Sequence, residues 1–147
     1  MFLNIVTDDE LLTSQIVKTI LLLIIGGSMG YNLFRVVRAD TRNKKIIILL
    51  LLFLLSACMI FVSRQYRVEA AMLKNPRYVQ GTTIGYCSVF AEGQGIEFEY
   101  KINGVTYRCC NTFHPVSKES LVVPGGKYKV RYAESYPNEG RMMFKKN

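Results

Sequence analysis

Three cysteines and one histidine are the residues of this 147-residue chain whose chemistry could define a site. Cys87, Cys109 and Cys110 belong to the C-terminal half, and His114 is the chain's only histidine. In an oxidising compartment, Cys87 is expected to form a disulfide with one member of the adjacent pair. Neighbouring residues of a strand point to opposite faces, so Cys109 and Cys110 cannot both reach Cys87 and one thiol should remain free. Fully reduced thiols are the alternative.

Two other chemical roles for these side chains have less support in the sequence. A metal site built from Cys87, Cys109, Cys110 and His114 would lack the Cys-x-x-Cys spacing typical of zinc centres, so we expect no metal. As a general base for Cys110, His114 would need the thiol within hydrogen-bond reach and a third group to orient its ring. The sequence indicates neither arrangement. We therefore expect no catalytic residues, no cofactor and no enzyme activity.

The cysteine pair ends a segment that predicts a β-hairpin, GIEFEYKINGVTYRCC. Its two alternating runs flank Asn103-Gly104, the pair preferred in a two-residue type I′ turn. This turn fixes the register and places Tyr100 opposite Tyr107 and Phe98 opposite Cys109 on one apolar face. Cys109 then points inward and is the favoured partner of Cys87, although a β-bulge would exchange the roles of Cys109 and Cys110.

The rest of the C-terminal half predicts further short strands. They cover residues 78–90, with an interruption at Gly85, then residues 127–132 and 141–144, and loops are expected over residues 91–95, 123–126 and 135–140. About five short strands in this length favour a small antiparallel β-barrel or β-sandwich over residues 75–147. The expected fold class is therefore α+β, because the N-terminal half reads as helical.

A basic surface is expected on the strand KYKVRY. Alternation places Lys127, Lys129 and Arg131 on one face, opposite an apolar face. Residues 64–147 contain 13 Lys and Arg against 7 Glu, a net charge of +6, which attracts acidic proteins or anionic lipid headgroups. No nucleic-acid recognition module is visible, and we expect no nucleic-acid partner.

Two apolar runs precede this domain, over residues 16–37 and 46–62. The second contains 17 consecutive uncharged residues, about 25 Å as a helix, which is the short end of what a bilayer core requires. Good helix formers continue to residue 74, where Asn75-Pro76 should end the helix. The sequence thus predicts an N-terminal segment (residues 1–15) and a transmembrane helical hairpin (residues 16–74) with a helical extension over residues 63–74.

The orientation of the hairpin follows from its charges. The loop over residues 38–45 and its approach carry five cations against Asp40, which predicts a cytoplasmic loop. The N-terminal segment is acidic, with Asp8, Asp9 and Glu10. Both termini would then lie in the periplasm of a bacterium with the chain in the inner membrane.

Gly26 and Gly30 form a Gly-x-x-x-Gly pair within the first run. Such small residues let another helix approach closely. The partner would be the chain's own second span near Ser56, Ala57 and Cys58, or the first span of a second copy in a homo-oligomer.

The C-terminal half resembles a poorly characterised family of small bacterial membrane proteins with one or two spans and a compact β-domain. The resemblance rests on Tyr-x-x-Asn-Gly-x-x-Tyr (residues 100–107), a Gly-Lys strand with alternating Tyr, Val and Tyr (residues 126–132), Pro137 and a short last strand. It covers roughly residues 78–144. It implies a fold and no activity, and the double cysteine departs from the pattern.

These features together predict a non-enzymatic, two-pass inner-membrane protein. Its basic periplasmic domain would bind another protein as an accessory or assembly subunit of an envelope complex, with membrane lipid around its spans. The alternative is an immunity protein that neutralises a toxin at the inner membrane.

Overall fold

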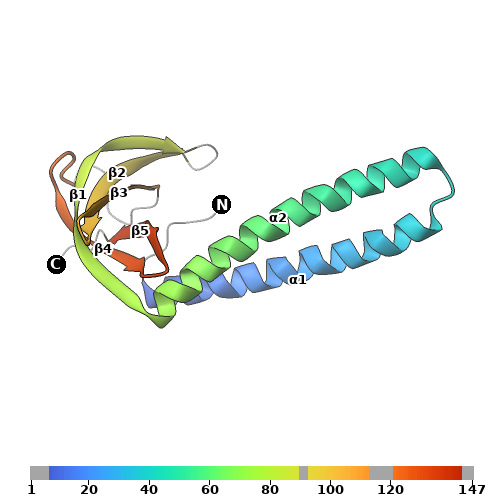
Figure 1. Ribbon diagram of the computed structural model, residues 1–147, viewed down its shortest axis with the longest axis horizontal. Coiled ribbons are helices and arrows are strands. Elements are labelled where there is room, and N and C mark those ends of the chain that lie inside the picture. Colours follow the sequence, from blue (N-terminus) through green and yellow to red (C-terminus); the bar gives the residue numbers. More distant parts are fainter. Residues whose placement is uncertain (1–6, 90–92, 113–120, 144–147) are drawn as a thin grey trace. The chain divides into compact units, whose positions relative to one another are not determined.

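The computed structural model describes residues 7–89, 93–112 and 121–143. Two helices, α1 (Asp8–Arg38) and α2 (Arg42–Lys74), precede an antiparallel sheet (Figure 1). Its strands are β1 (Pro76–Val89), β2 (Gly93–Ile102), β3 (Val105–Asn111), β4 (Lys127–Ala133) and β5 (Tyr136–Met143). The chain divides into two compact units: a helical unit, Leu12–Arg67, and a β unit that joins Met1–Leu11 to Val68–Asn147. The β unit therefore includes the last two turns of α2, which the sequence assigned to the hairpin.

Helix α1 begins at Asp8, within the stretch predicted only as an N-terminal segment. Thr7 and Glu10 form a capping box: Thr7 N–H donates to Glu10 Oε2 at 3.1 Å, and Glu10 N–H donates to Thr7 Oγ1 at 3.4 Å. The three acidic residues of the first turn also favour the positive end of the helix.

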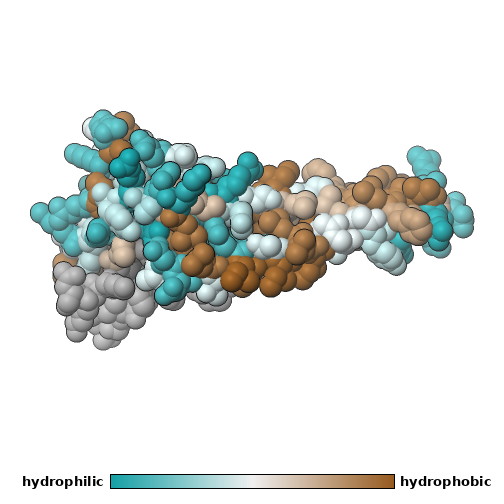
Figure 2. Space-filling view, turned by 90° about the horizontal axis from the view of Figure 1, so that it is seen from below, coloured by the Kyte–Doolittle hydropathy of each residue, from teal (hydrophilic) through white to brown (hydrophobic). Residues whose placement is uncertain are grey.

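Helix α2 continues without a break through residues 63–74, which confirms the predicted extension. In the helical unit α1 and α2 run antiparallel, joined by the short bend at residues 39–41 (Figure 1). Both are long and apolar enough to cross a membrane. Large apolar side chains on both helices face outward, and Figure 2 shows them as brown surface over the helices, with hydrophilic residues at the bend.

The sheet has the strand order β3-β2-β1-β4-β5 and is curled almost into a barrel. Side chains connect its two outer strands: Cys109 Sγ–H on β3 donates to Asn138 O on β5 at 3.3 Å, and Asn111 Nδ2 donates to Met142 O at 3.5 Å. The outer strands β3 and β5 therefore lie close together, and the sheet is nearly closed. This topology by itself assigns no ligand.

The central hairpin has the predicted register. Phe98 pairs with Cys109 and Tyr100 with Tyr107, and the turn residues Asn103 and Gly104 have φ of 50° and 84°. Positive φ at both positions is what a type I′ turn requires. The inward face forms the barrel core, made of Ile96, Phe98, Tyr100, Val130 and Met142.

Strand β5 begins earlier than predicted, at Tyr136, where the sequence favoured a loop over residues 135–140. The reason is a contact that pattern alone does not reveal. Tyr100 OH donates to Pro137 O at 2.5 Å and accepts from Gly140 N–H at 2.9 Å, so the core tyrosine holds β5 against the barrel. A Cβ at Gly140 would lie 2.5 Å from Cζ of Tyr100, which only glycine avoids. Phe144, the predicted end of the strand, lies outside the described residues.

The substitution Gly140→Ala should destabilise the β unit by about 1–3 kcal/mol, because the ring of Tyr100 is enclosed by the core and cannot move aside. Thermal unfolding of the full chain in detergent, followed by near-ultraviolet circular dichroism of the tyrosines, measures this. Gly85→Ala is the matched control, since a Cβ there meets nothing within 4 Å. Equal losses in the two variants would contradict the proposed role of the contact.

Candidate functional site

Two arginines stand opposite each other on the outward face of β4 and β5. Arg131 and Arg141 are direct cross-strand partners, and both are buried. Like charges at such positions repel and would destabilise the strand pair unless anions compensate them. The two ends of the helices supply those anions.

Glu69 on α2 compensates Arg141. Both terminal nitrogens of Arg141 donate to Glu69 Oε1 at 3.1 Å, and the Glu69 side chain is fully buried. A buried carboxylate needs such a partner, since an uncompensated charge removed from water is strongly unfavourable. Glu69 is the only acidic residue of α2, placed beside the apolar Val68 and Met72, a pattern that could have indicated a buried pair.

Arg131 is compensated by the start of α1. Its Nη1 lies 2.6 Å from Asp8 Oδ1, and its Nη2 donates to the carbonyl oxygen of Met72 at 2.8 Å. The predicted basic surface is therefore wrong at Arg131, because the ends of α1 and α2 cover this outward face. Lys127 and Lys129 are exposed as predicted, with Lys129 Nζ 4.3 Å from the ring centroid of Tyr78.

Apolar packing surrounds these ion pairs. Leu11, Val68, Met72 and Ala133 form a second buried cluster in the β unit. We call the two ion pairs and this cluster the charged joint. It fixes the first turn of α1 and the last two turns of α2 on the sheet.

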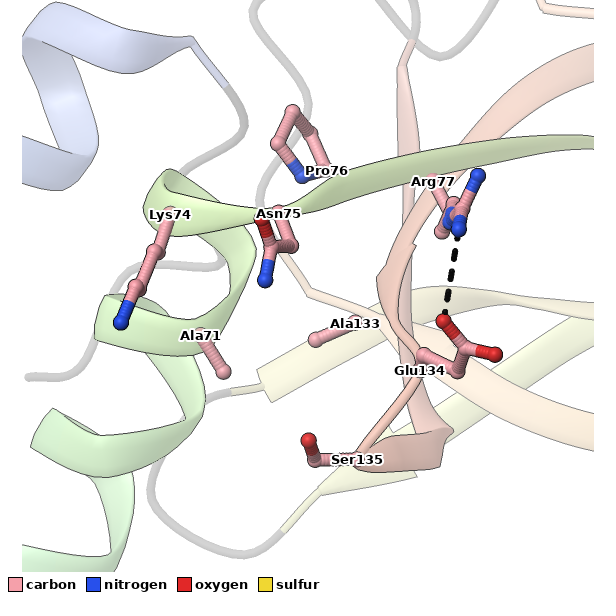
Figure 3. A pocket seen from close by; sticks show the side chains of 8 residues that line it. All are labelled: Ala71, Lys74, Asn75, Pro76, Arg77, Ala133, Glu134 and Ser135. Atoms are coloured by element: carbon pink, nitrogen blue, oxygen red, sulfur yellow. Dashed lines mark hydrogen bonds and ion pairs between the residues drawn. The ribbon is translucent and has the colours of Figure 1, made fainter.

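A cavity of about 830 Å³ lies beside the charged joint, where α2 ends and β1 begins. We call it the corner groove. Its lining comes from the end of α2, the start of β1 and the β4–β5 turn (Figure 3): Ala71, Lys74, Asn75, Pro76, Arg77, Ala133, Glu134 and Ser135. Arg77 and Glu134 face each other across one wall, with Arg77 Nη2 3.5 Å from Glu134 Oε2.

The Arg77–Glu134 pair is solvent-exposed, with 61% and 79% of the side chains accessible, so it contributes little to stability and can exchange partners. With Lys74 alongside, the corner groove offers two cations, one carboxylate and the polar side chains of Asn75 and Ser135. This set suits a polar protein segment that carries an acidic group. Sequence reasoning missed the groove because its residues meet only after folding.

The disulfide joins Cys87 to Cys110, with Cα atoms 6.0 Å apart, and Cys109 is free. The prediction of a disulfide agrees with this structure, but the preference for Cys109 was wrong. The register of β1 against β2 shifts between Thr83 and Gly85. The extra residue turns Cys87 to the outward face, which is the face of Cys110.

Cys109 points into the barrel as predicted. Its sulfur lies 3.6 Å from Tyr100 OH. Burial raises the pKa of the Cys109 thiol, and burial together with the thiol contact raises the pKa of Tyr100. Both groups are therefore protonated at neutral pH, and the described surroundings of Cys109 are those of a core thiol rather than of an activated nucleophile.

The remaining predicted residues are not brought to one site. A Cβ at Gly26 would lie 3.8 Å from Met59 Cε, an ordinary contact between the two helices, whereas one at Gly30 meets nothing within 4 Å. His114 lies outside the described residues. The disulfide uses Cys87 and Cys110, two of the four residues of the alternative metal site. Because the sulfur of Cys110 is bonded, it is also not available as a thiol to a general base.

Comparison of the chain with protein-family models, curated proteins and solved structures finds no match.

Removal of the buried carboxylate should weaken the β unit strongly. Glu69→Gln leaves the Arg141 charge buried without its anion, and we expect a loss of about 3–5 kcal/mol in the free energy of unfolding. Adding Arg141→Met should restore much of the loss, because neither charge of the Glu69–Arg141 pair then remains buried. Urea unfolding of the full chain in detergent measures both variants.

Glu134→Gln is the control, since it breaks an exposed ion pair and should cost less than about 1 kcal/mol. If Glu69→Gln costs no more than Glu134→Gln, the charged joint does not stabilise the β unit.

Counting free thiols by mass after alkylation in denaturant, without reductant, tests the disulfide. The protein should carry two free thiols out of four, Cys58 and Cys109. Cys109→Ser should leave one, because the bridge persists, and Cys110→Ser should leave three. The opposite pattern would assign the bridge to Cys109. Loss of the bridge should also lower stability by about 3 kcal/mol.

Proposed function

We propose that this protein is a two-pass protein of a bacterial inner membrane, and that its β unit is a protein-binding module on the periplasmic side. In this proposal the chain is an accessory or assembly subunit that docks onto a larger envelope complex. It acts by binding and not by chemistry.

The exposed apolar surface of the helices is the observation that carries the proposal. Residues such as Leu23, Phe53 and Ile60 are 72%, 76% and 69% exposed. A helix that is apolar on most sides needs lipid or protein around it, since water solvates such a surface poorly. Lipid around both helices satisfies this need along their whole apolar length.

Two features support the periplasmic side. The bend concentrates five cations, Arg35, Arg38, Arg42, Lys44 and Lys45, which favours its retention in the cytoplasm. The Cys87–Cys110 disulfide is the bond expected of a domain in an oxidising compartment. An antiparallel helix pair with a cytoplasmic bend carries both termini to the periplasm.

The corner groove supports binding. It combines cations, a carboxylate and apolar carbon in one concavity, and its exposed Arg77–Glu134 pair can open to receive a partner's charges. An acidic segment of another membrane protein fits this set, because Lys74 and Arg77 outnumber Glu134.

Labelling of introduced cysteines tests the side of the membrane on which the β unit lies. In a Cys58→Ser/Cys109→Ser background, a membrane-impermeant maleimide applied to whole cells should label Thr106→Cys on the hairpin and should label Asp40→Cys only after lysis. Labelling of Asp40→Cys alone in whole cells would reverse the orientation.

A photo-crosslinking residue at Ser135 in the corner groove should capture a partner from the same cells, and one at Thr106 should not. Adding Arg77→Glu should reduce the capture several-fold. A resident envelope protein as the captured species supports an accessory subunit, whereas a toxin supports the immunity alternative. Equal capture from both positions would show that the groove is not the binding surface.

A further inference from the structure

A cavity of about 490 Å³ lies at the bend of the helical unit, between the end of α1 and the start of α2. Three cations line it: Arg35 and Arg38 from α1 and Lys44 from α2. The described part of the chain places no carboxylate within ion-pair distance of these three side chains. Asp40 also lines the cavity, so its charged lining has a net charge of +2.

Aromatic rings hold the two arginines in place. The guanidinium carbon of Arg38 lies 4.2 Å from the ring centroid of Phe34, and that of Arg35 lies 5.8 Å from the ring centroid of Tyr31. Stacking engages the flat face of a guanidinium and leaves the N–H groups at its edge available. Those edges can donate two parallel hydrogen bonds to the oxygens of a phosphodiester, a contact that an apolar ligand cannot make.

The other wall of the cavity is apolar. Ile47, Ile48 and Leu51 of α2 line it directly beside the cations. A free phosphate ion would use only the cationic side, whereas an amphiphile would use both. In each helix the cations lie next to the end of the apolar run that is nearer the bend. Lipid headgroups lie at this depth in a bilayer.

We propose that this cavity, the bend site, binds the headgroup of an anionic glycerophospholipid such as phosphatidylglycerol. Arg35, Arg38 and Lys44 contact the phosphodiester, and the first carbons of an acyl chain lie along Ile47 and Leu51. Asp40 accepts hydrogen bonds from the glycerol hydroxyls. The proposal rests on the membrane location proposed above and adds to it a specific lipid.

Native mass spectrometry of the full chain in detergent tests the bend site. The chain is titrated with anionic phosphatidylglycerol or with zwitterionic phosphatidylcholine or phosphatidylethanolamine, with and without inorganic phosphate. Arg38→Gln/Lys44→Gln should weaken phosphatidylglycerol binding about tenfold, because it removes two charge-assisted contacts. Arg42→Gln/Lys45→Gln is the matched control: it removes the same charge from the same bend, at positions that do not line the cavity. The control should bind phosphatidylglycerol as the unaltered chain does.

Each other outcome overturns the proposal. Equal losses in the two variants mean general attraction to a cationic surface, and equal binding of both lipids means that the headgroup is not recognised. Competition by inorganic phosphate at matching concentration means that the ion alone occupies the cavity. Preference for phosphatidylethanolamine that disappears with Asp40→Asn means that Asp40 selects an ammonium group instead.

Carbonate extraction of membranes from cells that express the same variants separates this inference from the proposed function. An unaltered chain that remains in the membrane but shows no lipid preference refutes the bend site only. A chain extracted by carbonate refutes the membrane location itself.

Discussion

Two opposed arginines determine how the β unit is assembled. Arg131 and Arg141 face each other across β4 and β5 on the outward side of the sheet, where water would normally solvate them. They are instead covered by the ends of α1 and α2, and burial of two like charges is tolerable only because Asp8 and Glu69 arrive with that cover. The helix ends and the sheet thus depend on each other. A sheet without the helix ends would expose the pair, and helix ends without the sheet would expose Glu69 and an apolar cluster.

The same constraint explains why a small domain of five short strands can hold together. Domains of this size bury too little apolar surface to be very stable alone. Here the core inside the barrel is supplemented by a second cluster on its outer face, by the Cys87–Cys110 disulfide, and by Tyr100, which connects β2 to the backbone of β5. Each addition joins elements that are distant in the sequence. The corner groove lies beside the charged joint and is lined by segments that the joint holds together.

The parts of the fold that a few neighbouring residues determine were predicted correctly from the sequence. The Asn103-Gly104 turn fixes its own register, and Asn75-Pro76 ends α2, so both were readable from a few residues. The errors occurred where distant elements meet. The alternating pattern of residues 127–132 places Arg131 on the outward face, and only the covering helix ends bury it. Pro137 and Gly140 read as loop residues, and only the ring of Tyr100 makes glycine necessary within a strand.

The disulfide shows how one residue can reverse such a prediction. Counted from the hairpin without irregularity, Cys87 would pair with Gln94 and point inward to Cys109. The bulge between Thr83 and Gly85 inserts one residue, so that Cys87 pairs with Gly95 and faces outward to Cys110. Cys109 is thereby left inside, where its thiol bonds to Asn138 and helps to join β3 to β5. Successive side chains of a strand point to opposite faces of the sheet. A single inserted residue therefore decides which cysteine forms the bridge and which one helps to close the barrel.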